Sequence, residues 1–145
     1  MKIIHVIAYG TLLLALGALL LVGTWLFYPY QVFTYPKDTM EILNENKEAV
    51  PGGRLLIRGG TIHHTKGKQV TTSPQLSDGV LVQFPITRYV TEGGEFSSVR
   101  TLELPSYLHT GTYRIQFFTS VKMNPLRTMH FIRETEDFKI IESYE

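Results

Sequence analysis

The side chains that could carry chemistry in this chain begin with two adjacent histidines, His63 and His64. Neighbouring residues on a β-strand point to opposite faces of the sheet, so this pair cannot simply chelate one metal ion. His109 and His130 lie far along the chain, and the sequence has neither a His-x-His pair nor a helical His-Glu-x-x-His motif. The sequence therefore predicts exposed or hydrogen-bonded histidines and no metal site.

The acidic and glycine-rich segments do not indicate catalysis either. Glu92 and Glu95 flank Gly93-Gly94 in an expected hairpin tip, where two carboxylates suit a soluble turn better than acid–base catalysis. The other glycine pairs, at 52–53 and 59–60, are not followed by a helix, so they do not form a phosphate-binding loop. We expect no catalytic residue, no cofactor and no enzymatic activity.

A basic stretch at 54–68 contains four Lys or Arg side chains and no acid, and an acidic stretch at 38–48 precedes it. Two interpretations are open. The basic stretch could contact anionic lipid headgroups if it faces a bilayer, or the two stretches could pair with each other on a solvated sheet.

Overall charge and cysteine content narrow the class of protein. Apart from Lys2, the chain has thirteen basic and thirteen acidic residues, so their charges balance. It therefore lacks the excess of positive charge that is typical of a nucleic-acid-binding protein. Cysteine is absent, whereas exported animal domains of this size usually carry disulfides. This composition favours a bacterial envelope or a bacteriophage as the setting.

Residues 7–28 contain no charged side chain and are predicted to form a transmembrane helix. Twenty-two helical residues span roughly 33 Å, enough to cross a hydrocarbon core. Aromatic side chains gather at the C-terminal end in the pattern of an interfacial belt; they are Trp25, Phe27, Tyr28 and Tyr30. The apolar region is too long for a cleavable signal peptide and no Ala-x-Ala site follows it, so we favour an uncleaved signal anchor.

The orientation of the helix follows from charge. Lys2 lies on the short side, and no positive charge follows the helix until Lys37. The positive-inside rule then predicts a cytoplasmic stub at 1–6 and a periplasmic or extracytoplasmic domain, with the helix in the inner membrane.

One face of this helix carries small residues at a seven-residue spacing, namely Gly10, Gly17 and Thr24. Small residues let membrane helices approach closely. This face predicts either a homo-oligomer or docking to another membrane protein, although glycine is also common in membrane helices that do not associate.

The remaining sequence predicts a short interfacial tether at 29–36 and one all-β domain at 37–145. Short segments of alternating hydrophobicity separated by turn signals predict about seven antiparallel strands. They include 54–65, as either a strand pair or one strand with a bulge at Gly59-Gly60, a strand at 79–86, and a hairpin of 87–91 with 96–104. The segment 112–123 alternates most clearly, and Asn124-Pro125 turns the chain back into 126–141.

A local motif before the segment 112–123 contains Leu108, Gly111 and Tyr113. It resembles the tyrosine corner of immunoglobulin-like and fibronectin-type β-sandwiches, in which the tyrosine hydroxyl fixes the loop before a late strand. The resemblance implies an Ig-like antiparallel β-sandwich. It implies no function, because sandwiches host many unrelated roles.

Two apolar side chains, Leu81 and Phe118, are predicted to point outward among polar neighbours and to mark a partner surface. The favoured hypothesis is a membrane-anchored, non-catalytic interaction or assembly module of a bacterial envelope or bacteriophage-encoded complex. Its partners would be membrane lipid, a protein bound through the helix or the domain, or a second copy. The alternatives are an accessory subunit of a polytopic membrane enzyme or transporter and a structural protein of a membrane-containing virion.

Overall fold

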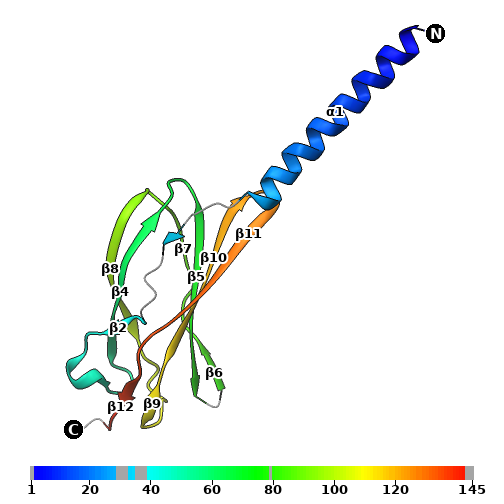
Figure 1. Ribbon diagram of the computed structural model, residues 1–145. Helices are drawn as coiled ribbons and strands as arrows, with labels where there is room; N and C mark the ends of the chain where they lie inside the picture. Colours follow the sequence, from blue (N-terminus) through cyan, green and yellow to red (C-terminus); the bar gives the residue numbers. More distant parts are fainter. Residues whose placement is uncertain (1, 29–32, 35–38, 79, 143–145) are drawn as a thin grey trace.

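The computed structural model describes residues 2–28, 33–34, 39–78 and 80–142 (Figure 1). It is mostly β, with one N-terminal apolar helix and several largely antiparallel sheets. The elements are α1 (Lys2–Phe27), β1 (Phe33–Thr34), β2 (Glu41–Ile42), the short 3-10 helix η1 (Glu45–Lys47), β3 (Glu48–Ala49), β4 (Arg54–His64), β5 (Gln69–Asp78), β6 (Val80–Gln83), β7 (Thr87–Val90), β8 (Gly94–Glu103), β9 (Gly111–Tyr113), β10 (Ile115–Asn124), β11 (Arg127–Glu134) and β12 (Phe138–Ile140).

Helix α1 projects away from the β domain, and its segment Ile4–Phe27 is long and apolar enough to cross a membrane (Figure 1). No residue in its most apolar stretch of 18 residues is buried by the rest of the chain. The hydroxyl of Thr11 donates to the carbonyl of Ile7 at 3.1 Å, and that of Thr24 donates to Leu20 at 2.8 Å. Both threonine hydroxyls are therefore satisfied within the helix. The helix begins at Lys2, so most of the expected stub is helical.

The first sheet is built around β4. Strand β8 pairs with one edge of β4, while β1 and β2 pair with the other edge at different positions along it. The β4–β8 register shifts between Arg58 and Thr61, which confirms the expected irregularity at Gly59-Gly60. Because Phe33–Thr34 pairs with His63–His64, two residues of the expected tether belong to this sheet.

The second sheet has the order β11-β10-β5, and β6 and β7 share the far edge of β5. The β10–β11 pair forms the hairpin expected from Asn124-Pro125. Strand β5 was not expected, because Pro74 and several polar residues interrupt its pattern. On the far edge of β5, residues 69–72 pair with β7 and residues 75–78 pair with β6. Pro74 lies between these two groups, so the N–H that proline lacks is not needed for pairing there.

A third, small sheet joins β3, β12 and β9, with β3 parallel to β12. One core unites all three sheets. It contains Leu55 and Ile57 from β4, Ile115 and Phe117 from β10, and Phe138 from β12, each at most 1% exposed. A second cluster formed by Val70, Val121 and Met123 lies toward the hairpin end of the domain.

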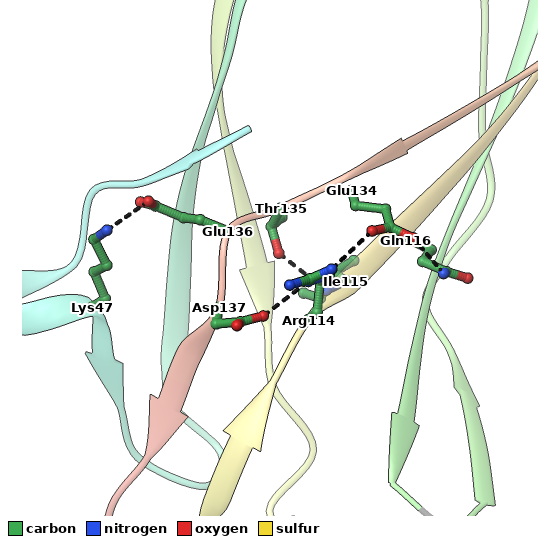
Figure 2. Close-up of polar contacts among 8 residues, drawn as sticks. All are labelled: Lys47, Arg114, Ile115, Gln116, Glu134, Thr135, Glu136 and Asp137. Atoms are coloured by element: carbon green, nitrogen blue, oxygen red, sulfur yellow. Dashed lines mark hydrogen bonds and ion pairs between the residues drawn. The ribbon is translucent and has the colours of Figure 1, made fainter. Parts of the chain in front are cut away.

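The segment between β11 and β12 carries a network of polar contacts (Figure 2). Thr135 is fully buried, and its hydroxyl accepts a hydrogen bond from the Ile115 amide at 3.0 Å. Arg114 bridges Asp137 of this segment and Glu134 at the end of β11, with its Nε 2.8 Å from Asp137 and its guanidinium 3.1 Å from Glu134. These contacts fix the point where the chain passes from the second sheet to the third.

Two expectations about strands require correction. Glu92-Gly93-Gly94-Glu95 does not close a hairpin, because β7 pairs with β5 and β8 pairs with β4. The chain crosses from one sheet to the other at this point. In addition, the described residues form twelve strands rather than about seven, because several strands of two to four residues are too short to show a pattern. The arrangement by itself does not establish an Ig-like topology.

Candidate interaction surfaces

Strand β8 forms an open edge of the first sheet (Figure 1). It is ten residues long, and within the described chain it pairs only with β4. Val99, near the middle of β8, points outward and is 53% exposed. The next residue, Arg100, points to the other face of the sheet, and its guanidinium carbon lies 6.0 Å from the centre of the Phe117 ring in the core. A long edge with an exposed apolar side chain is a template for adding another strand.

A cleft of about 400 Å³ opens beside the start of β8. Its lining includes His64 from β4, Tyr89 from β7 and Phe96 from β8, and the histidine ring stacks on Tyr89 with ring centres 6.3 Å apart. Burial, and secondarily the positive charge of Arg100, lower the pKa of His64 below its ordinary value. The cleft is therefore lined by aromatic rings and an imidazole that favours its neutral form.

The tyrosine-corner resemblance predicts a hydrogen bond that the structure contains. The hydroxyl of Tyr113 donates to the backbone carbonyl of His109 at 2.9 Å, and the Tyr113 side chain is buried. Leu108 is buried in the main core, and Gly111 lies beside the tyrosine ring, where a Cβ would make ordinary contacts at 3.4 Å or more. The three residues form one local unit whose role is structural.

The aromatic residues expected to form an interfacial belt differ in their exposure. Phe27 and Tyr28 are exposed, Trp25 is half-buried, and Tyr30 lies outside the described residues. The face expected to pack against another helix is open, because no other part of the chain lies within 4 Å of a Cβ placed on Gly10 or Gly17. Thr24, one turn before Tyr28, is also exposed.

The β10–β11 hairpin contacts the end of the helix, which the sequence did not predict. The amide of Asn124 donates to the carbonyl of Trp25 at 2.8 Å, and the guanidinium of Arg127 donates to that of Tyr28 at 2.7 Å. Trp25 belongs to the last turn of α1 and Tyr28 directly follows it, so both carbonyls lie at the helix end, where backbone acceptors lack partners within the helix. The hairpin end therefore lies beside the C-terminal end of α1. The sequence indicates a turn at Asn124-Pro125, but nothing in it indicates that this turn contacts the helix.

Leu81 and Phe118 lie on the same outer face of the second sheet but do not form one patch. Phe118 pairs with Ser73 of β5, whereas Leu81 pairs with Ser77, four residues further along that strand. Leu81 is exposed, and Phe118 is only half-buried rather than fully outward. The exposed neighbour of Phe118 is Ile132, directly across from it on β11.

The basic and acidic stretches do pair in part. Glu41 is opposite Arg58 in the sheet register, and their side chains form an ion pair at 3.1 Å. Arg54 lies 3.8 Å from Glu103, and His63 lies 3.3 Å from Glu95. Within the residues that the structure describes, no three His, Asp or Glu side chains gather as a metal site would require.

Comparisons with known proteins identify no family. No protein-family model and no curated protein matches the chain. Among solved structures it is similar to a beta-glucosidase from Listeria innocua, with 17% identity and a TM-score of 0.40 over 79% of this chain and 16% of that one. It is also similar to Spo0M, a sporulation control protein from Bacillus subtilis, with 12% identity and a TM-score of 0.37 over 74% and 49% of the two chains. The chain spans less than half the length of either protein, and scores this low carry no argument about fold or function.

Proposed function

We propose that this chain is a single-pass, membrane-anchored interaction module that acts in assembly and without catalysis. The proposal places the N-terminus in the cytoplasm and the β domain outside the inner membrane of a bacterial cell, or in a complex encoded by a bacteriophage. The observation that carries it is the open edge of β8, with Val99 exposed at its centre. A partner segment could add to this edge as a strand, with backbone hydrogen bonds supplying affinity and side-chain contacts supplying specificity.

The geometry makes a partner protein a better occupant of this edge than a second copy in the same membrane. Strand β4 ends at the end of the domain nearest the helix (Figure 1), and β8 is antiparallel to it. Strand β8 therefore begins near the helix and runs away from it. Two copies anchored in one bilayer would present their β8 strands in the same direction. An antiparallel pair between them would require one domain to be inverted.

The test is site-specific photocrosslinking in cells of the native source. A photoreactive amino acid replaces Val99 in the full-length chain, and adducts are identified by mass spectrometry after gentle detergent extraction. We expect one defined protein adduct. The matched control replaces Lys139, an exposed residue of β12 whose two edges pair with β3 and β9. Equal adducts at both positions, or none at Val99, would reject the β8 edge as the interaction site.

A charge at the edge gives a second readout. Lysine on an edge strand opposes strand addition, so Val99→Lys should remove the co-purifying partner. Ile86→Lys, at an exposed loop position outside β8, should retain it.

The open small-residue face of α1 supports a second candidate, an accessory subunit of a polytopic membrane enzyme or transporter. In that case Gly17→Leu, rather than Val99→Lys, would remove the partner. Unchanged assembly of Gly17→Leu in detergent would reject this alternative. A structural role in a membrane-containing virion predicts many copies of the chain in one particle.

A further inference from the structure

Three loops meet where the β domain faces the end of the helix. They are 65–68 between β4 and β5, 91–93 between β7 and β8, and the hairpin end 123–127; together we call them the helix-proximal tip. The amide of Gly67 donates to the carbonyl of Thr91 at 2.8 Å, and the amide of Thr91 donates back to that of Lys68 at 2.9 Å. The ammonium group of Lys68 donates to the carbonyl of Met123 at 2.9 Å. These bonds join the three loops into one unit.

The hairpin connects this unit to the helix through the bonds from Asn124 to Trp25 and from Arg127 to Tyr28. Trp and Tyr prefer the headgroup region of a bilayer. A helix that crosses a membrane with its aromatic end at this depth therefore holds the tip beside the headgroups.

The charge of the tip and its surroundings is mainly basic. Lys66 and Lys122 are exposed, while Lys68 and Arg127 are half-buried and bonded to backbone carbonyls. The exposed acids nearby are Glu92 and Glu95, and Glu95 already lies 3.3 Å from His63. The remaining basic side chains of the 54–68 stretch, Arg54 and Arg58, are paired with Glu103 and Glu41 along β4, so they do not add to this charge.

The tip also exposes an apolar side chain at the turn of the hairpin. Leu126 is 52% exposed and lies two residues from Asn124, whose side chain bonds to the helix end. A leucine at headgroup depth can insert into the interface while adjacent lysines contact phosphate groups.

We infer that the helix-proximal tip docks on the anionic surface of the bilayer that holds the helix, through Lys66 and Lys122 with Leu126 inserted. This inference rests on the membrane anchoring in the proposed function but not on the β8 edge. Docking would hold the domain in one orientation relative to the bilayer and keep β8 at a fixed distance from the bilayer surface, where its partner binds. Lipid with a net negative headgroup is the occupant, because it matches both the charge and the position.

The experiment uses the full-length chain in lipid vesicles and exploits its lack of cysteine. Leu126→Cys carries an environment-sensitive fluorophore, and lipids spin-labelled at the headgroup quench it. Leu81→Cys is the matched control, because Leu81 is similarly exposed (62%) but lies on β6 at the opposite end of the domain. Vesicles contain phosphatidylcholine alone or a mixture with phosphatidylglycerol.

We expect quenching at position 126 to exceed that at 81, and to rise about twofold when phosphatidylglycerol is present. The rise should disappear in about 1 M salt, where the Debye length is about 3 Å. Lys66→Gln with Lys122→Gln should remove the rise, whereas Lys139→Gln, which removes one lysine charge on β12, should not. Equal quenching at 126 and 81, or a rise that survives the double substitution, would overturn the inference. Failure of the chain to float with the vesicles would reject the membrane anchoring itself, whatever the β8 crosslinking shows.

Discussion

The Tyr113 hydroxyl is a single polar group whose loss can be measured at the scale of one residue. It lies in a buried side chain and donates to the His109 carbonyl at 2.9 Å. Tyr113→Phe keeps the ring and removes this donor, so the free energy of unfolding should fall by about 1 kcal/mol. Urea denaturation of the full chain in detergent, followed by circular dichroism, measures the change.

Tyr107→Phe is the control for this substitution, because Tyr107 is 66% exposed. It should change stability by much less than Tyr113→Phe. Equal stability of the Tyr113→Phe variant and the natural chain would show that the corner bond is not stabilising. The main argument for an Ig-like fold would then be lost.

At the scale of elements, the crossover between β7 and β8 depends on two consecutive glycines with positive φ. Gly93 has φ +87°, and a Cβ at this position would lie 3.0 Å from the Cβ of Lys66. Gly94 has φ +91° but open space around it. Substituting alanine at either position should lower the free energy of unfolding by about 1 kcal/mol, because alanine disfavours positive φ. Gly93→Ala should also bring its Cβ into close contact with the loop at 65–68.

We therefore expect Gly93→Ala to destabilise the chain more than Gly94→Ala in the same urea titration. Equal destabilisation would mean that the loop moves aside at no cost. The comparison isolates the contact between the crossover and the neighbouring loop from the backbone strain that both glycines share.

At the scale of the whole molecule, Glu136 lies in the segment that joins the second sheet to the third, and its side chain bonds back toward the first sheet (Figure 2). Its carboxylate accepts from the Lys47 ammonium at 2.5 Å and from the Ile42 amide at 2.8 Å. The hydrogen bond from Lys47, followed by that from Ile42, lowers the pKa of Glu136 below its ordinary value of 4.5. The carboxylate is therefore favoured in the folded state.

Because the pKa is lower in the folded state, this stabilisation is fully present above about pH 4.5 and is lost as the pH falls through the lowered folded pKa. Glu136→Gln keeps the size of the side chain and removes its charge, so it should cost about 1 kcal/mol at pH 7. The difference from the natural chain should shrink toward pH 3. Glu142→Gln, at an exposed position, is the control; a pH-independent difference for Glu136→Gln would contradict this account.

The features that the sequence determined by itself are local. An uncharged run of twenty-two residues predicts a long apolar helix, and the threonines within it bond one turn back along the same helix. The alternation of residues 112–123 predicts β10, and the corner bond joins residues only four apart. Such features follow from one segment alone, because its periodicity and its short-range bonds do not depend on the rest of the chain.

The choice of strand partners was decided only by the tertiary structure. Gly93-Gly94 looks like a hairpin turn, but β7 and β8 pair with strands in different sheets. Strand β5 contains Pro74 and still lies inside a sheet, because its neighbours leave a gap at that position. The open β8 edge and the contact of the hairpin with the helix end likewise join segments far apart in sequence. Their formation depends on burying a shared core, and that free energy belongs to no single segment.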